Sequence, residues 1–295
     1  MKKKVLITLL LVITIITSIF STVYATDEQV EIPSKYDLRN DINIKVENQK
    51  DKPWCGAYSE IKMIETYIQK TKGIDYDLSE GYATHRSEFG GTYGKYVLES
   101  DFPTKDYKLT EANQKKFNEA TSKAVIENFE YAENISKDEE TLKRYIMNYG
   151  GVFISTSTCN QWHNYKGGIY RSEPISANRV EHGVIVIGWD DNYSKDNFVY
   201  EKPSKDGAWL ILNSWGTNWG NNGTAWVSYE DYYNVIGNSS YIKGITLSNN
   251  ETIKTEYTTK QDKIKKLETQ VIEQETIEPN KTSNTYNIFI IVFAV

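Results

Sequence analysis

Residues Asn48 to Ser59 read N-Q-K-D-K-P-W-C-G-A-Y-S, and the rest of the chain is organised around this stretch. It holds Cys55, one of two cysteines among 295 residues, and Gln49 lies six residues before it. A thiol can act as a nucleophile, and a side-chain amide can donate a hydrogen bond to a developing oxyanion. The stretch therefore predicts a reactive cysteine with an oxyanion donor nearby.

The residues after Cys55 have apolar side chains at helical spacing. This stripe consists of Ala57, Ile61, Ile64 and Ile68. Pro53 suits the entrance of such a helix, and Gly73 is a natural end. We therefore expect Cys55 in the first turn, where unpaired N–H groups and the helix dipole favour an anion.

Two motifs far downstream supply partners for the thiol. V-E-H-G-V surrounds His182, and L-N-S-W-G-T-N-W-G surrounds Asn213. An imidazole can accept the thiol proton, and an amide oxygen can hydrogen-bond the other ring nitrogen and fix its tautomer. If the fold brings both residues to Cys55, the result is a hydrolase that works through an acyl-enzyme. Gln49 and the backbone N–H of Cys55 would then donate to the oxyanion.

Composition narrows the class of protein. The length allows one large domain or two small ones. A net charge of -6 and a pI near 5.3, without an extended basic run beyond the first residues, argue against nucleic acid as a partner. Two cysteines could form only one disulfide, which would consume the nucleophile. We therefore expect free thiols, with Cys159 as a small buried apolar side chain.

Residues 1–25 have the pattern of a secretory signal peptide. Three lysines precede an apolar run from Val5 to Phe20, and a small-x-small pattern ends at Ala25. An uncleaved membrane anchor is the alternative, although the run is short for a span. In both cases we expect export. Because Ile32 to Arg39 already forms an extended entry into the fold, we expect no prodomain.

The chain changes character near its middle. Helix starts are expected at Asp77 to Glu80 and, from a capping box, at Ser136 to Glu139, whereas residues 100–135 show no clear period. Five later segments are predicted strands, the third and fourth buried on both faces: Val152 to Thr158, Gly168 to Arg171, Val184 to Trp189, Ala208 to Asn213 and Thr224 to Tyr229. This order predicts an α+β fold, mainly helical over about 32–135 and mainly sheet over about 136–247.

Two segments are predicted to lie outside the core. Asp190 to Gly207 carries four aspartates without the spacing of a calcium loop, so we expect a solvated loop and no metal. After Leu247 the composition becomes polar, which predicts a linker over residues 248–287. Residues 288–295 are apolar but too few to span a bilayer, so they are either an ordinary terminus or the start of a truncated anchor.

Other candidate residues have plainer interpretations. His85 lacks an acid, amide or cysteine beside it, which favours a surface or helix-packing role. His163 lies near Cys159 and suggests a competing dyad, but no Asn-Ser-Trp partner or helix start accompanies it. Gly90 and Gly91 in F-G-G-T-Y-G either let a ligand approach the backbone or make a turn.

Together these motifs resemble those of papain-like cysteine peptidases of the cathepsin type. Gln49 six residues before Cys55, E-H-G at His182 and N-S-W-G at Asn213 come in that family's order. The resemblance implies a two-lobe fold, with a helical left lobe, a sheet-rich, barrel-like right lobe, and the active-site cleft between them.

The resemblance also implies a role for each residue. The nucleophile, the general base and acid, the orienting amide and the oxyanion donor would be Cys55, His182, Asn213 and Gln49. Trp215 would shield the hydrogen bond of the imidazole from water. The glycine pair would bind the substrate backbone as an added strand. Predicted substrate-binding residues are Gly90, Gly91, Gly183 and Trp215.

The chain departs from the family pattern beside the nucleophile. Trp54 precedes Cys55 and Gly56 follows it, whereas the family has Trp directly after the nucleophile. Lys52 and Pro53 stand where the family has Cys-Gly, so that disulfide cannot form. The expected lack of a prodomain and the long insertion before Asn213 match a bacterial type of this family.

The sequence thus predicts an exported cysteine peptidase, secreted or at the cell surface, with a signal peptide over 1–25 and a peptidase domain over 26–247. We expect it to act on peptides or proteins as a monomer without cofactor or metal, and to contact membrane only through the signal or a C-terminal anchor. Two alternatives stay open: a non-catalytic surface or binding protein on the same fold, and a transpeptidase using the same site.

Overall fold

The structure is a computed structural model, and it describes residues 31–255 except 90, 107, 109, 134–137, 175–181 and 234. The described residues belong to one compact unit, which ends at Thr255. The predicted signal peptide, most of the predicted linker and the apolar end lie outside them. Within the described ranges, no helix is both long and apolar enough to cross a membrane.

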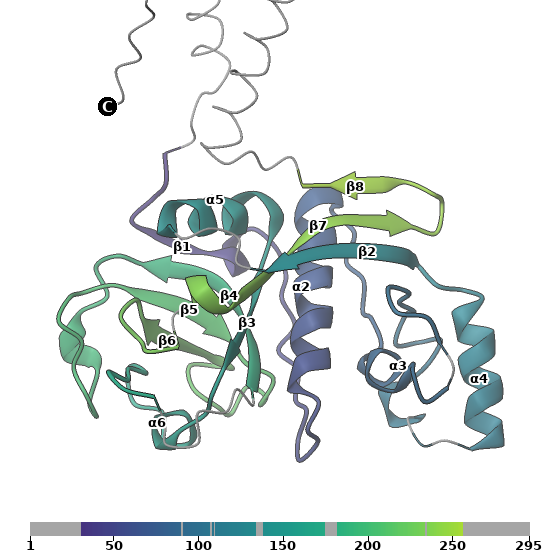
Figure 1. The fold of residues 1–295 in the computed structure, drawn as a ribbon, viewed down its shortest axis with the longest axis horizontal. Coiled ribbons are helices and arrows are strands. Elements are labelled where there is room, and N and C mark those ends of the chain that lie inside the picture. The colour runs from purple at the N-terminus through teal and green to yellow at the C-terminus, as the bar shows by residue number, and fades with distance from the viewer. Residues whose placement is uncertain are drawn as a thin grey trace, which may run out of the picture. The chain divides into compact units, whose positions relative to one another are not determined.

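Eight strands form one antiparallel sheet (Figure 1). They are β1 (Lys35–Asp37), β2 (Ile126–Glu133), β3 (Val152–Thr156), β4 (His182–Asp190), β5 (Ala208–Leu212), β6 (Thr224–Ser228), β7 (Ser239–Leu247) and β8 (Thr252–Lys254). Their order is β2-β7-β3-β4-β5-β6, with β1 paired to β4 and β8 paired to β7. Because β2 and β6 end this path unpaired with each other in the described part of the chain, the sheet is open. The α+β class is confirmed.

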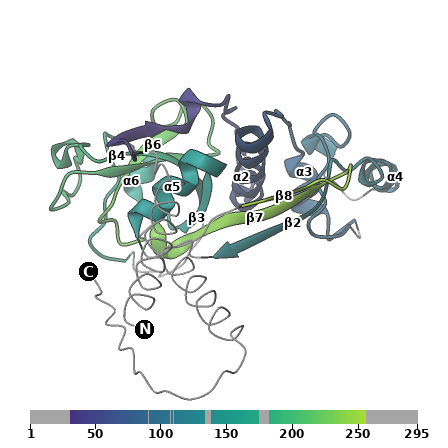
Figure 2. The same ribbon diagram turned by 90° about the horizontal axis from the view of Figure 1, so that it is seen from above.

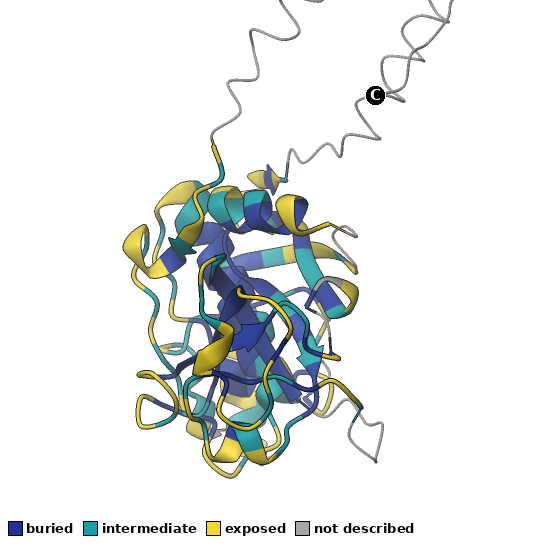
Figure 3. Cartoon of the chain, turned by 90° about the vertical axis from the view of Figure 1, so that its left-hand side faces the viewer, coloured by how far each residue is buried: buried dark blue, intermediate teal, exposed yellow. Residues whose placement is uncertain are grey.

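Among the described residues, five α-helices accompany the sheet: α2 (Cys55–Lys72), α3 (Glu80–His85), α4 (Glu111–Thr121), α5 (Glu139–Tyr149) and α6 (Asn160–His163). Short 3-10 helices occupy Leu38–Asn40, Thr104–Asp106, Lys195–Asn197 and Ile236–Asn238. Figures 1 and 2 show α2 between the strands β4 to β6 and the helices α3 and α4. Figure 3 shows buried residues gathered in the interior and exposed residues on the outer loops.

The central helix α2 forms as its sequence predicts. Ile61, Ile64 and Ile68 are fully buried and pack in one cluster with Ile185 of β4. Burial of each such side chain is worth about 1.5–3 kcal/mol. Gly73 ends the helix in the left-handed conformation, at φ 69°, and its N–H donates to the last turn. This packing fixes the start of α2 against the beginning of β4.

The sheet differs from the prediction in three places. β2 and β7 lie where no strand was predicted, and β2 brings the first half of the chain into the sheet. Glu130 pairs with Gly244 but Tyr131 pairs with Ile242, so one extra residue in β7 interrupts the alternation that marks a strand. The predicted strand Gly168 to Arg171 makes only an isolated bridge, at Ile169. β8 continues the fold beyond Leu247, where the predicted domain ends.

Candidate active site

Cys55 is the first residue of α2, and Trp54 is the N-cap residue before it. The helix has 18 residues and no acidic residue in its first turn, so its positive end is not neutralised from within. Cys55 is partly buried, and it and Cys159 are free of disulfides. A cysteine at such a helix start lies where backbone N–H groups can bind an anion.

His182 and Asn213 meet because β4 and β5 are antiparallel neighbours. His182 begins β4 and Asn213 follows the end of β5 directly, so both lie at the same end of this strand pair. His182 Nε2 lies 2.9 Å from Asn213 Oδ1, and both side chains are buried. Oδ1 also accepts from the Ser214 N–H at 2.8 Å. An acceptor at this position requires the hydrogen of a neutral imidazole on Nε2, which leaves Nδ1 for another partner.

Gly183 places this pair beside the start of α2. A Cβ atom added to Gly183 would lie 3.4 Å from the carbonyl oxygen of Cys55 and 3.0 Å from the ring of Phe153. The Phe153 ring would therefore have to shift to admit a larger residue, whereas the contact with Cys55 is an ordinary van der Waals distance. The approach of the two backbones brings His182, the residue before Gly183 in β4, to the end of α2 that holds Cys55.

Gln49 is held between the asparagine motif and the cysteine loop. Its side-chain oxygen accepts from Ser214 Oγ at 2.5 Å, and its Nε2 donates to the carbonyl oxygen of Lys52 at 2.6 Å. The backbone N–H of Gln49 donates to the Ser214 carbonyl oxygen at 2.7 Å. An amide nitrogen has two hydrogens, so Nε2 keeps a second donor. Ser214 thus connects Gln49 to Asn213.

Two tryptophans contact the imidazole of His182, and a third packs against them. The Trp215 ring centroid lies 4.9 Å from that of His182, and Trp162 contacts the imidazole edge-on at 5.6 Å. Trp219 stacks on Trp162 at 5.9 Å, and its Nε1 donates to the Trp162 carbonyl oxygen. Trp162 is fully buried. Sequence reasoning missed Trp162, because nothing in its local pattern indicates contact with a histidine twenty residues away.

The surroundings of His163 and Cys159 differ from those predicted. Cys159 is the N-cap residue of the short helix α6, so a helix start does accompany this pair. His163 stacks on Trp215 of the Asn-Ser-Trp motif, with ring centroids 5.3 Å apart and an interplanar angle of 12°. The side chain of Cys159 is partly buried and packs against a hydrophobic cluster that includes Val152 and Trp162.

The residues beside Cys55 leave the helix start intact. Trp54 packs edge-on against His85, with ring centroids 5.1 Å apart, which agrees with a helix-packing role for His85. Gly56 has open space where its side chain would be, with no heavy atom within 4 Å of an added Cβ. No side chain therefore occupies the space beside Gly56, where the family has a tryptophan. Trp54, the residue before the nucleophile, packs on α3 instead.

The predicted glycine pair is only partly described. Gly90 lies outside the described residues. The N–H of Gly91 donates to the Arg86 carbonyl oxygen at 2.6 Å, and an added Cβ would lie 2.6 Å from the ring of Phe117. Gly91 is thus required for close packing, and pairing with a substrate backbone would have to use its carbonyl group.

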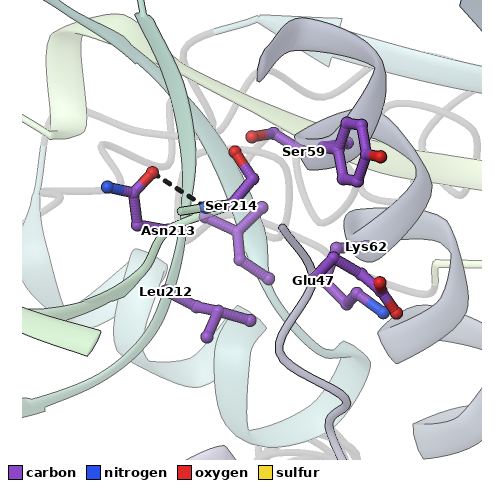
Figure 4. Close-up of a pocket in the computed structure, with 8 residues that line it drawn as sticks. Glu47, Ser59, Lys62, Leu212, Asn213 and Ser214 are labelled. Carbon is purple, nitrogen blue, oxygen red and sulfur yellow. Dashed lines mark hydrogen bonds between the residues drawn. The ribbon is translucent and has the colours of Figure 1, made fainter. Parts of the chain in front are cut away.

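A small cavity of about 10 Å³ lies beside Asn213 and Ser214 (Figure 4). Its lining consists of Glu47, Tyr58, Ser59, Lys62, Ile185, Leu212, Asn213 and Ser214. Asn213 Nδ2 is buried and has no hydrogen-bond partner among the described residues. The cavity volume is close to the minimum for one water molecule, and Nδ2 points away from the other labelled lining residues (Figure 4).

Two buried acidic side chains interact with residues that line this cavity, Glu65 with Lys62 and Glu80 with Glu47. Burial, together with the carboxylates of Glu47 and Glu65, raises the pKa of Glu80 to about 8. Burial also raises the pKa of Glu65, against the lowering effect of Lys62, with which it forms an ion pair. A neutral Glu80 therefore limits the negative charge near Glu47 and Glu65 at neutral pH.

Comparison with known proteins gives one family. The family model described as papain family cysteine protease matches residues 32–243, more than half of the chain. Cysteine proteinase 1 of Dictyostelium discoideum is 32% identical over 130 residues, which cover 44% of this chain and 34% of that protein. Cathepsin K of Mus musculus is 26% identical over 221 residues, which cover 69% of this chain and 62% of that protein. The chain thus spans between 34% and 62% of the length of these two relatives.

Solved structures agree with this result. The clostridial cysteine protease Cwp84 after propeptide cleavage superposes with a TM-score of 0.59 and 26% identity, covering 73% of this chain and 59% of that one. The bromelain protease of Ananas comosus, in complex with the E64 inhibitor, has a TM-score of 0.53 and 20% identity, covering 72% and 99%. The second likeness concerns the fold alone.

Proposed function

We propose that this chain, which belongs to the papain family of cysteine proteases, hydrolyses peptide bonds through an acyl-enzyme on Cys55. The observation that carries the proposal is the 2.9 Å contact between His182 Nε2 and Asn213 Oδ1. With Nε2 bonded to Asn213, Nδ1 is the ring nitrogen left to accept the thiol proton, which supports the proposal.

In the acylation step, His182 Nδ1 takes the thiol proton of Cys55, and Sγ forms a bond to the substrate carbonyl carbon. The electron pair of the carbonyl moves onto its oxygen, which accepts hydrogen bonds from the Cys55 N–H and from Gln49 Nε2. The C–N bond then breaks, the imidazolium gives its proton to the leaving nitrogen, and a thioester remains.

Deacylation repeats these transfers with water. His182 removes a proton from the water while its oxygen attacks the thioester carbon, and the C–S bond breaks to give the carboxylic acid and the Cys55 thiolate. Asn213 holds the imidazole orientation in both steps. Trp215 and Trp162 keep water from the His182 to Asn213 hydrogen bond, which strengthens it.

Export is part of the proposal and is supported by the signal-like residues 1–25. The peptidase would then act outside the cytoplasm, as a secreted or cell-surface protein. Its proposed domain begins at residue 26 and includes β8, so it extends past Leu247 to Thr255, and a polar linker is proposed after it.

The proposed activity can be tested with a mixture of fluorogenic peptides under reducing conditions. The full chain should cleave members of the panel, and Cys55→Ala should abolish cleavage. Cys159→Ala is the matched control, because it removes the other thiol and should keep the activity. An inert wild-type chain, or a Cys55→Ala variant that still cleaves, would refute the proposal. An added amine nucleophile distinguishes hydrolysis from transpeptidation in the products.

A further inference from the structure

We propose that His163 binds a carboxylate on the leaving-group side of the scissile bond and so makes the enzyme prefer substrates with an acidic group there. This inference rests on the proposed function of Cys55 and His182. It concerns the residue directly after the scissile bond, whose nitrogen receives the proton from His182.

The position of His163 follows from the ring contacts. Asn213 holds Nε2 of His182, so the leaving nitrogen takes its proton from the opposite edge of that imidazole and its residue lies beside the ring. Trp215 flanks the same imidazole, with ring centroids 4.9 Å apart. His163 stacks nearly parallel on Trp215 at 5.3 Å. His163 is therefore one ring away from the group that protonates the leaving residue.

Hydrogen bonds to three other segments of the chain hold the helix that carries His163. Trp219 Nε1 donates to the Trp162 carbonyl oxygen at 2.7 Å, and Tyr200 Oη donates to the Asn164 carbonyl oxygen at 2.7 Å. The side chain of Gln161 bonds the backbone of Tyr170 twice, at 2.7 and 2.9 Å. A ring held in this way is preorganised, so little conformational entropy is lost when it binds a ligand.

The exposed ring edge of His163 can donate a hydrogen bond to a carboxylate. His163 is exposed, and stacking on Trp215 leaves its ring nitrogens at the ring edge, where a neutral or protonated imidazole has at least one N–H donor. Residues 152–172 contain no Asp or Glu, and the guanidinium of Arg171 is buried and paired with Asp231. Glu47 precedes Asn48, whose backbone forms a β-bridge with Trp215. The Glu47 carboxylate is paired with Lys45, with 2.9 Å between Oε1 and Nζ.

A carboxylate can come from an acidic side chain or from the end of a peptide, and matched substrates separate these sources. All share one acyl part. The first pair are longer amidated peptides that carry either Asp or Asn directly after the scissile bond. The second pair end at an Asn in that position, with its terminal carboxyl group either free or amidated. A coumarin amide with the same acyl part has no leaving residue. A hydrogen bond to a charged group predicts a preference in kcat/KM of about tenfold for the carboxylate member of one pair or both.

The variants test whether His163 carries this preference. His163→Phe keeps a stacked ring without N–H groups and should bring the ratio to about one, with coumarin amide cleavage unchanged. Lys166→Ala is the matched control, removes a nearby exposed cation and should keep the ratio. The inference is overturned by a wild-type ratio of one in both pairs, by an unchanged ratio in His163→Phe, or by loss of the ratio in Lys166→Ala. If the wild type cleaves neither the peptides nor the coumarin amide, the proposed function itself fails.

Discussion

Replacing Glu80 by Gln should make the free energy of unfolding decrease less as the pH rises. Glu80 is the first residue of α3 and is only 7% exposed. Burial and the carboxylates of Glu47 and Glu65 raise its pKa from 4.5 to about 8, although a helix start would favour the anion. Burial outweighs the dipole because α3 has only six residues. Gln keeps an oxygen that can accept from Thr104 Oγ1, which lies 3.1 Å from the carboxylate.

The sign follows from proton linkage. Below pH 4.5 the carboxyl group is neutral in both the folded and the unfolded chain. The stability that the protein has with a neutral Glu80 is therefore fully present. As the pH rises from 4.5 to about 8, the unfolded chain releases a proton that the folded protein keeps, and part of that stability is lost. The displaced pKa corresponds to roughly 5 kcal/mol, and relaxation around the ionised group should reduce this to about 2–3 kcal/mol. Glu80→Gln lacks this loss.

Chemical denaturation at pH 5, 7 and 9 measures the difference, in a Cys55→Ala background that prevents self-cleavage. The free energy of unfolding of Glu80→Gln, relative to its parent, should rise by about 2–3 kcal/mol between pH 5 and pH 9. Glu111→Gln is the matched control, because Glu111 holds the same position in α4 but is exposed. A pH-independent difference for Glu80→Gln, or the same rise for Glu111→Gln, would refute the reasoning.

Three further substitutions test the site and its support. Gln49→Ala should lower kcat on the order of 10²-fold to 10³-fold with little change in KM, because an oxyanion donor is lost, and an unchanged kcat in steady-state assays would contradict that role. Arg171 forms an ion pair with the buried Asp231 at 2.6 Å. Arg171→Leu leaves that carboxylate without its cation and should lower the free energy of unfolding by about 3–5 kcal/mol. A loss below about 1 kcal/mol would contradict this. Gly150→Ala should cost about 2 kcal/mol or more, because φ is 115° and the added Cβ would lie 2.9 Å from the Thr66 backbone; equal denaturation midpoints would show the strain to be negligible.

Local signals in the sequence predict those parts of the fold that depend on neighbouring residues. The helix from Cys55 to Gly73 follows from an apolar stripe and a glycine end, and the two central strands follow from continuous apolar runs. The edge of the sheet could not be predicted in this way. β2 has exposed aromatic residues such as Tyr131, and the extra residue in β7 shifts its inward face, so neither strand shows a sustained alternation.

The motifs also identify the residues that the site brings together, but not their surroundings. The meeting of His182 and Asn213 depends on the antiparallel pairing of β4 with β5, which follows once both segments are predicted as strands. The contacts of Trp162 and His163 depend instead on how α6 folds back over Trp215. That placement is set by hydrogen bonds from residues far along the chain, and no local pattern encodes it.

The central claim is that His182 activates Cys55, and a thiol-reactive peptidase probe tests it most directly. The full chain is treated with an electrophilic peptide probe, and the labelled cysteine is located by peptide mass mapping. The account predicts label on Cys55 and none on Cys159, with labelling of Cys55 strongly reduced in His182→Ala. Equal label on both cysteines, or undiminished label in His182→Ala, would contradict it.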